Sequence, residues 1–432
     1  MTVTDTIFAL GTGAGRAAIA VIRISGPGAG GALAALVGKL PKPRQASFAI
    51  LRDPQTGEML DRGLALFFPG PASSTGEDYG ELQLHGGRAV VEGALAALHR
   101  LPGLRPAEPG EFARRGFANG KLDLSQAEAL ADLIDAQTEA QRRQALRVAG
   151  GALRRKVEAW RAALVESLAL VEAELDFSDE ADVGAFSPAR LSALLSPLAE
   201  DMRAALQLAP ASERMRDGFL VMILGRPNVG KSTLINALTR RDLAIVSPIP
   251  GTTRDMIEAH LDIGGMPVTL IDTAGLREAA DAIERIGVDR TLARVETADL
   301  ALWLSDSAEA PPEHDVETIR VATKTDLTPA LEGAIGVCAL SGEGLQTLAA
   351  AIETRARARL GDGATSLIVR ERHRHALEQA VESIDSILVG GEALEIQAEA
   401  LRRASRALGR IVGAVDVEEI LDAVFSRFCI GK

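Results

Sequence analysis

The sequence is poor in cysteine and in long hydrophobic runs. Only two of its 432 residues are cysteines, Cys338 and Cys429, and they lie too far apart in the sequence to indicate a disulfide framework, which is typical of a reducing compartment. No run approaches the roughly 18 apolar residues that span a bilayer, and the first ten residues lack the basic and apolar regions of a signal peptide. We therefore expect a cytoplasmic protein that makes no use of a membrane.

Aromatic residues and positive charge are also scarce. One Tyr and two Trp leave few rings on which nucleic-acid bases could stack, and a net charge of -12 argues against a generally basic surface. Arginines cluster at 142–147, 154–156, 370–375 and 402–410, and each cluster taken alone is typical of a solvated helix face. Any nucleic-acid binding is therefore expected to be local.

The length favours two or three domains. Up to residue 121, short apolar runs between Gly and Pro clusters predict an α+β domain. Ser125 and Glu128 form a predicted capping box, after which helical periodicity continues to about residue 214 and returns in the tail. We predict an α+β domain (1–121), a discontinuous all-α domain (122–214 and 368–432) and an α/β domain inserted into it (215–367).

A strand, a glycine-rich loop and a helix are predicted near the middle of the chain. The apolar run at 219–224 is typical of a buried parallel strand, and the next eight residues, GRPNVGKS, fit the phosphate-loop pattern G-x-x-x-x-G-K-[ST]. In such a loop the backbone N–H groups point at phosphate oxygens, Lys231 neutralises the β- and γ-phosphates, and Ser232 binds Mg²⁺. The sequence therefore predicts a P-loop nucleotide-binding site.

Three downstream elements indicate GTP rather than ATP. Asp272 begins a D-T-A-G sequence that resembles the D-x-x-G element of GTPases, whose carboxylate holds Mg²⁺ through water. Thr252 and Thr253 resemble the mobile switch whose threonine closes onto Mg²⁺. The TKTD sequence at 323–326 resembles the base reader N-K-x-D, in which Asp326 would accept hydrogen bonds from guanine N1 and N2. Four elements in the right order predict a GTPase with a Ras-like G domain.

Two positions around the predicted base site depart from the pattern. Thr323 stands in place of Asn, and Cys338 stands where a Ser is expected after the next strand. Thr is shorter than Asn and a thiol is a poor donor, so we expect guanine specificity that is loosened. Cys338 is equally well interpreted as a small buried hydrophobic residue.

The position that carries the water-orienting Gln in Ras-like proteins is Leu276 here. An aliphatic side chain cannot orient water, so hydrolysis needs another polar group. The residues alone do not choose among the candidates between 276 and 287, which are Arg277, Glu278, Asp281, Glu284 and Arg285.

Five sequence elements together are typical of one family. They are the GRPNVGKS loop, the GTTRD sequence at 251–255, DTAGLR at 272–277, IERIG at 283–287 and above all the C-terminal FCIGK at 428–432. Through these elements the chain as a whole resembles the MnmE family, also called TrmE, of tRNA-modification GTPases. The resemblance covers nearly the whole chain, with a shortened stretch between about residues 305 and 337. Era-like and Der-like ribosome-assembly GTPases are the alternative, but they carry a KH module or a second phosphate loop.

The resemblance implies a K⁺-dependent GTPase in which G domains dimerise. It places K⁺ where an arginine finger would sit, with Asn228 and oxygens around Ser247, Ile249 and Thr252 as ligands, and it gives Glu284 the role of orienting the catalytic water. A monovalent cation can offset charge that develops between the phosphates.

The resemblance also implies the reaction and the partners. The N-terminal domain of the family mediates homodimerisation and binds a tetrahydrofolate one-carbon donor such as 5-formyltetrahydrofolate, here through Arg23, Glu81, Lys121 and Lys432, near Cys429 of the tail. With the flavoprotein MnmG, also called GidA, the family installs an aminomethyl or carboxymethylaminomethyl group at C5 of the wobble uridine of certain tRNAs.

The expected sites comprise GTP or GDP, Mg²⁺, K⁺ and folate positions. We expect Glu284 and Cys429 to be catalytic, and Ser232, Thr253, Asn228, Ser247, Ile249 and Thr252 to be metal ligands. The residues expected to bind cofactors are Asn228, Val229, Gly230, Lys231, Ser232, Thr233, Ser247, Pro248, Ile249, Pro250, Gly251, Thr252, Thr253, Asp272, Thr273, Ala274, Gly275, Lys324, Asp326, Arg23, Glu81, Lys121 and Lys432.

Overall fold

The structure is a computed structural model that divides into two compact units. They comprise Met1–Ala131 with Arg406–Lys432, and Asp132–Ser405. The residues described are 5–13, 15–177, 187–239, 258–272, 298–307, 309–329, 332–361, 367–415, 418–426, 428 and 430–431. Within these ranges, no helix is both long enough and apolar enough to cross a bilayer. The domain boundaries expected from the sequence stay predictions.

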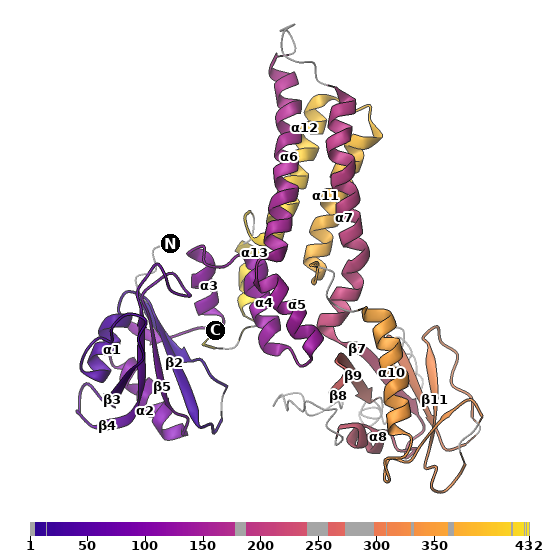
Figure 1. The fold of residues 1–432 in the computed structure, drawn as a ribbon, viewed down its shortest axis with the longest axis horizontal. Helices are drawn as coiled ribbons and strands as arrows, with labels where there is room; N and C mark the ends of the chain where they lie inside the picture. Colours follow the sequence, from indigo (N-terminus) through magenta and orange to yellow (C-terminus); the bar gives the residue numbers. More distant parts are fainter. Residues whose placement is uncertain are drawn as a thin grey trace, which may run out of the picture. The chain divides into compact units, whose positions relative to one another are not determined.

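The first unit is built on a six-stranded sheet with the strand order β3-β4-β5-β2-β1-β6 (Figure 1). Strand β6 pairs parallel to β1 and the other neighbours pair antiparallel. Its elements are β1 (Thr6–Leu10), β2 (Ile19–Ser25), α1 (Ala29–Val37), β3 (Ser47–Arg52), β4 (Met59–Phe68), β5 (Tyr79–His85), α2 (Arg88–His99), β6 (Leu104–Pro106), α3 (Glu111–Ala118) and α13 (Glu418–Phe425); α4 (Leu124–Asp135) and α12 (Leu394–Val412) each span the division between the units.

Helices α1 and α2 supply much of the apolar surface that buries one face of this sheet. Leu33 and Leu36 of α1 and Leu98 of α2 are fully or nearly fully buried in one cluster with Ile22 and Ile24 of β2. Side chains alternate between the two faces of a strand, so Arg23, which lies between those two isoleucines, points to the opposite face. The architecture of this unit therefore leaves polar residues of β2 and β5 on the face away from α1 and α2.

The helix expected near Ser125 is present, but the predicted capping box is wrong. The Asp123 carboxylate accepts a hydrogen bond from the Gln126 backbone N–H at 2.9 Å, and the Gln126 side chain accepts from the Asp123 N–H at 3.1 Å. Ser125 lies inside α4 and donates to the Asp123 carboxylate at 2.6 Å. Asp123 caps the helix because a carboxylate can accept from the orphan N–H groups of the first turn, so the box begins two residues before Ser125.

The second unit contains another six-stranded sheet, with the order β12-β11-β10-β7-β9-β8. All neighbours pair parallel except β8 and β9, which are antiparallel. Its elements are β7 (Phe219–Gly225), α8 (Lys231–Leu238), β8 (Glu258–Ile263), β9 (Met266–Asp272), β10 (Leu300–Ser305), β11 (Thr318–Thr323), β12 (Ile335–Val337) and α10 (Leu345–Leu360). The apolar run at 219–224 forms the central strand β7, as expected of a strand buried on both faces.

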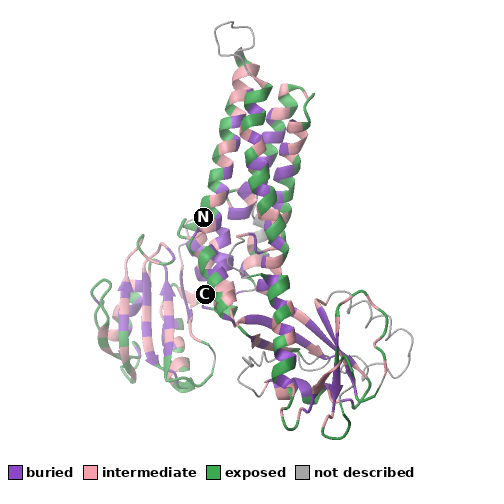
Figure 2. Ribbon diagram, turned by 45° about the vertical axis from the view of Figure 1, so that its right-hand side comes forward, coloured by how far each residue is buried: buried purple, intermediate pink, exposed green. Residues whose placement is uncertain are grey.

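Long helices form the rest of the second unit, with buried residues (purple) on their inner sides and exposed residues (green) outside (Figure 2). They are α5 (Glu139–Ala149), α6 (Ala152–Phe177), α7 (Pro188–Asp217) and α11 (Glu371–Val389), together with the first part of α12. The buried Asp299 carboxylate accepts from the Leu220 N–H of β7 at 3.0 Å and lies 3.5 Å from Arg214 of α7 and 3.8 Å from Arg359 of α10. One carboxylate thus joins the end of α7 to the sheet.

The fold class predicted from the sequence is confirmed. An α+β unit with a mostly antiparallel sheet, a set of long helices contributed by two separate stretches of the chain, and a mostly parallel sheet with a phosphate loop are all present.

Candidate nucleotide and folate sites

The loop between β7 and α8 follows a path that depends on glycine. Gly225 has a φ of +147°, and a Cβ atom there would lie 2.5 Å from the Leu304 carbonyl oxygen of the neighbouring strand β10. Gly230 has a φ of +104° and is the N-cap of α8. Asn228, exposed between them, has a φ of +62°, a conformation that Asn tolerates better than most residues. The loop thus turns back on itself and leads directly into a helix N-terminus, where anions bind.

Lys231, the first residue of α8, closes over this loop. Its side chain is buried, and Nζ donates to the Gly225 carbonyl at 2.9 Å and the Arg226 carbonyl at 3.0 Å. The ammonium group is therefore positioned at the loop by the same backbone that would surround a phosphate. Its charge and the helix N-terminus both favour an anion there.

Ser232 and Asp272 bring two oxygen ligands together. Asp272 ends β9, which pairs with β7, and it is almost fully buried. The Ser232 hydroxyl, at the start of α8, donates to the Asp272 carboxylate at 3.0 Å. Thr233 follows on the exposed side of the helix. A hydroxyl and a carboxylate are ligands that suit Mg²⁺, which keeps several waters and is usually completed by substrate phosphates.

The end of β11 contacts the phosphate loop through the side-chain hydroxyl of Thr323. Thr323 is buried, and its Oγ1 donates to the Val229 carbonyl at 2.9 Å. Lys324 and Asp326 lie on the turn that follows. Cys338 is buried, as a small hydrophobic residue would be, and its thiol also lies 3.4 Å from the Asp326 carboxylate. The burial of Cys338 agrees with its interpretation as a small hydrophobic residue, and a role in base binding stays a prediction.

Two acidic residues beside the phosphate loop were not found from the sequence. Asp306 lies 3.0 Å from the Lys324 ammonium, whose hydrogen bond lowers the pKa of that carboxyl below its ordinary value. Glu309 pairs with Arg226 of the loop at 2.6 and 2.8 Å. No motif marks them; their only signal is their place just after strand β10.

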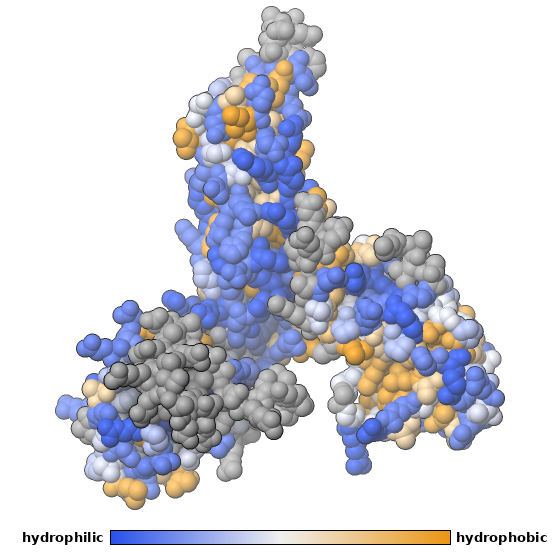
Figure 3. Space-filling model, turned by 180° about the vertical axis from the view of Figure 1, so that it is seen from behind, coloured by the Kyte–Doolittle hydropathy of each residue, from blue (hydrophilic) through white to orange (hydrophobic). Residues whose placement is uncertain are grey.

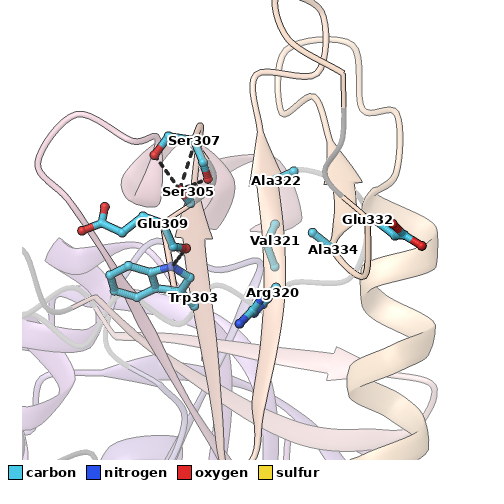
Figure 4. Close-up of a pocket in the computed structure, with 9 residues that line it drawn as sticks. All are labelled: Trp303, Ser305, Ser307, Glu309, Arg320, Val321, Ala322, Glu332 and Ala334. Atoms are coloured by element: carbon cyan, nitrogen blue, oxygen red, sulfur yellow. Dashed lines mark hydrogen bonds between the residues drawn. The ribbon is translucent and has the colours of Figure 1, made fainter. Parts of the chain in front are cut away.

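The segment after β10 is held by Trp303. Its indole Nε1 donates to the Glu309 carbonyl at 3.2 Å, and the Ser305 hydroxyl donates to the Ser307 carbonyl at 2.7 Å. Figure 4 draws both hydrogen bonds as dashed lines. These residues line a cavity of about 30 Å³ between β10 and β11, room for about one water molecule. The cavity is thus too small for a nucleotide, and Glu309 is one of the residues that line it.

In the first unit, Arg23 and Glu81 are direct cross-strand neighbours on β2 and β5. Arg23 Nε lies 3.9 Å from the Glu81 carboxylate, and this buried nitrogen has no hydrogen-bond partner within the described part of the chain. The Tyr79 hydroxyl donates to Glu81 at 3.2 Å, and burial raises the pKa of Tyr79.

Hydrophobic residues (orange) gather on the surface of the first unit in the view of Figure 3. Lys121 is exposed beyond the end of α3.

The tail of the chain reaches Arg23. Arg23 Nη1 donates to the Gly431 carbonyl at 3.1 Å, and Ile430 forms an isolated antiparallel bridge with Pro109. A Cβ atom at Gly431 would lie 2.1 Å from the Leu10 carbonyl, so only glycine fits in this position. The described part of the tail thus lies against the strands that carry Arg23.

Many of the expected site residues lie outside the described residues. These are Glu284 and Cys429, and the cofactor and metal positions Ser247, Pro248, Ile249, Pro250, Gly251, Thr252, Thr253, Thr273, Ala274, Gly275 and Lys432. Among the residues that the structure does describe, no group of three or more His, Cys, Asp or Glu side chains could hold a metal ion.

Comparisons with known proteins agree along the whole chain. The family described as "GTP-binding protein TrmE N-terminus" matches residues 6–121, and the family described as "MnmE helical domain" matches residues 124–429. Proteins named "tRNA modification GTPase MnmE" match from Beijerinckia indica, 53% identical over 99% of this chain and 96% of that protein, and from Azorhizobium caulinodans, 52% identical over 99% of each.

Among solved structures, the G domain of the T. maritima FeoB iron transporter is 25% identical over 32% of this chain and 98% of its own, with a TM-score of 0.25. The two family matches and the full-length relatives place this chain in the MnmE, or TrmE, family of tRNA modification GTPases.

Proposed function

We propose that this chain binds GTP with Mg²⁺, hydrolyses it, and acts in the modification of tRNA. The observation that carries the proposal is the meeting of the Ser232 hydroxyl and the Asp272 carboxylate at 3.0 Å, beside the buried Lys231. Two hard oxygen ligands next to an anion-binding helix N-terminus suit a Mg²⁺-nucleotide. Relatives named tRNA modification GTPase, about half identical over their full length, support the rest.

The residues around the loop divide the work of binding. Backbone N–H groups of Val229, Gly230 and the first turn of α8 donate hydrogen bonds to phosphate oxygens, and Lys231 neutralises the β- and γ-phosphates. Ser232 would bind Mg²⁺ directly and Asp272 would hold it through water, and the bound ion would offset the negative charge of the phosphates. Asp326 accepts hydrogen bonds from the guanine base. The close parallel packing of β7, β9, β10 and β11 supports this division, because it brings the ends of four strands to one edge.

Hydrolysis uses K⁺ and a glutamate. Asn228 is exposed at the top of the loop, where its amide oxygen is available to a monovalent cation. Oxygens around Ser247, Ile249 and Thr252 would complete the ligands, and K⁺ bound there would supply the positive charge that an arginine finger supplies in other GTPases. Glu284 orients the attacking water in place of the Gln that Leu276 replaces. Pairing of G domains in a homodimer assembles this site and changes the conformation of the protein.

The test is GTP turnover of the purified chain in K⁺ and in Na⁺. We expect K⁺ to stimulate turnover and Na⁺ to leave it at the basal rate. Glu284→Ala should abolish turnover while GDP affinity stays within about twofold, because a water-orienting residue acts in the transition state alone. Normal turnover of this variant would refute the role of Glu284, and equal rates in the two salts would refute the role of K⁺.

The tRNA reaction involves the first unit. Arg23, whose buried Nε has no hydrogen-bond partner among the described residues and lies beside Glu81, suits a polar ligand such as 5-formyltetrahydrofolate. Lys121, Lys432 and Cys429 act at the same site, and folate supplies the one-carbon unit. The product is an aminomethyl or carboxymethylaminomethyl group at C5 of the wobble uridine, made with the flavoprotein MnmG in a complex with the homodimer in the cytoplasm.

Mass spectrometry of tRNA nucleosides tests this reaction. A strain lacking the gene should lose the modified wobble uridine, and the wild-type gene should restore it. Unchanged nucleosides would contradict a role in modification and would favour a GTP-dependent binding switch. Size-exclusion chromatography of the chain alone and with MnmG tests the assembly; a monomer that elutes apart from MnmG would contradict both contacts.

A further inference from the structure

Thr323 uses its only donor away from the base site. Its Oγ1 lies 2.9 Å from the Val229 carbonyl oxygen, and the contact is buried. A carbonyl oxygen can only accept, so the hydroxyl must donate, and a Thr hydroxyl has one hydrogen. Toward any other neighbour, Oγ1 of Thr323 can therefore only accept a hydrogen bond.

Guanine offers acceptors on the edge that carries N7 and O6, and donors on the edge that carries N1 and N2. A hydroxyl whose hydrogen is already engaged cannot bond to N7. An Asn, as in the N-K-x-D pattern, has two amide hydrogens, so one can hold the phosphate loop while the other stays available for the base. Thr323 cannot donate both to the phosphate loop and to guanine N7.

The neighbouring side chains Lys324 and Cys338 each contact an acidic partner. The Lys324 ammonium lies 3.0 Å from the Asp306 carboxylate, and the Cys338 thiol, a weak donor, lies 3.4 Å from the Asp326 carboxylate. Asp326 is exposed and can accept from the N1 and N2 edge of guanine. Among the described side chains of the base reader, selection of the base thus falls on Asp326.

We propose that this chain recognises guanine through its N1 and N2 edge and leaves N7 without a side-chain hydrogen bond from position 323. Thr323 is then a positioning residue that holds β11 to the phosphate loop, and the site accepts guanine nucleotides altered at N7. This inference rests on the proposed function, because it requires that the site bind a guanine nucleotide.

The test compares the affinities of the full chain for GDP and for 7-deaza-GDP, in which a C–H group replaces N7. We expect the wild-type affinities to agree within about twofold. Thr323→Asn supplies the second donor, so it should favour GDP over 7-deaza-GDP by about 2- to 12-fold, the range of one net hydrogen bond. Inosine diphosphate, which lacks the N2 amino group, should bind wild-type protein about tenfold more weakly than GDP.

Thr323→Val is the matched control, because it keeps the shape of the side chain and removes the hydroxyl. A positioning role predicts equal losses of affinity for GDP and 7-deaza-GDP. Wild-type protein that binds 7-deaza-GDP several-fold more weakly than GDP overturns the inference while leaving the proposed function intact. Failure to bind any guanine nucleotide overturns both. The wild-type ratio decides the matter even where a variant does not fold.

Discussion

The two six-stranded sheets place their polar residues differently. In the parallel sheet of the second unit, Asp272 lies at the carboxyl end of its strand and Lys231 and Asp326 follow the carboxyl ends of theirs, where the chain leaves the sheet. In the antiparallel part of the sheet in the first unit, Arg23 and Glu81 lie within strands and meet as cross-strand neighbours. The parallel sheet thus forms its site from loops and the antiparallel sheet from its face.

This difference decides what a sequence pattern can reveal. A loop at a strand end is continuous in sequence, so its residues form a motif of fixed spacing. A pair on a sheet face is joined only by register, and Arg23 and Glu81 are 58 positions apart (81 minus 23). Some polar residues of the two sheets should stabilise the fold and others should bind a ligand, and substitution of each kind should distinguish these roles.

Removing a buried cation from the first unit should have the largest effect, and on stability. Arg115 is almost fully buried and pairs with Asp5 at 2.8 Å, Glu111 at 2.9 Å and Glu77 at 3.2 Å. Arg115→Met removes the buried cation that these carboxylates share, and although Asp5 and Glu111 keep Arg105 as a partner, it should lower the free energy of unfolding by about 3 kcal/mol. Urea denaturation followed by circular dichroism measures the loss, and GDP affinity should not change.

Arg114→Met is the matched control. Arg114 is half exposed and pairs with the exposed Asp422 at 3.2 Å, so its loss should cost at most about 1 kcal/mol. Equal destabilisation by the two variants would show that the ion pairs around Arg115 have no special role in the fold.

Lys231→Ala, in contrast to Arg115→Met, should mainly change GDP affinity. The variant removes the ammonium group that lies over the phosphate loop, so GDP affinity should fall by about 10- to 100-fold, the range of charge-assisted hydrogen bonds. Isothermal titration calorimetry measures this loss. Arg320→Ala, which removes an exposed cation from the same sheet, should bind GDP normally. If Lys231→Ala binds as tightly as wild type, the loop does not bind phosphate.

Arg23→Gln should weaken 5-formyltetrahydrofolate binding by about tenfold, because it removes a charge from the face of the antiparallel sheet. Fluorescence titration with the folate measures the loss, and GDP affinity should stay constant. Arg88→Gln removes an exposed cation of the same unit and should bind folate normally. Unchanged folate binding by Arg23→Gln would move the folate site away from this face.

The smallest effect should be a dependence of stability on pH. Burial opposes ionisation of Glu111, but hydrogen bonds from Arg105, the Glu108 N–H and Arg115 outweigh it and lower its pKa. A carboxyl with a lowered folded pKa contributes stability that is complete above its unfolded pKa of about 4.3 and is lost as pH falls through the folded value. The Tm should therefore fall with acidification below about pH 4.

Glu111→Gln should flatten that profile, since an amide does not titrate in this range. Glu92→Gln, at an exposed pair with Arg88, should leave it unchanged. An identical acid profile for wild type and Glu111→Gln would contradict the role of Glu111.

The sequence predicted the parallel sheet and its site more fully than the antiparallel one. The apolar run at 219–224 and the GRPNVGKS loop predicted β7, the loop and α8, because strand, loop and helix follow without interruption. The contact of Thr323 with Val229 was not predictable, since 94 positions separate the two residues. Asp306 and Glu309 were missed because ion pairs to Lys324 and Arg226 carry no sequence pattern.

Local patterns also failed where two candidates competed. Ser125 and Glu128 fit a capping box, but Asp123 and Gln126 form the box that the structure contains, because a carboxylate two residues earlier reaches the same first turn. In the first unit, Arg23 and Glu81 were expected only through the family, and their register places them together.

The length of helix α7 would amplify any rotation at the end that contacts Asp299. The helix has 30 residues, which corresponds to a length of about 45 Å at 1.5 Å per residue. Its end near Arg214 continues through Gly218 into β7, contributes Met215 to the core of the sheet, and is also joined to the sheet by the buried Asp299 carboxylate. A rotation of about 10° at that joint would move the far end of a straight helix of this length by about 8 Å. A small angular change at this end of α7 would therefore become, at its other end, a displacement more than twice the length of a hydrogen bond.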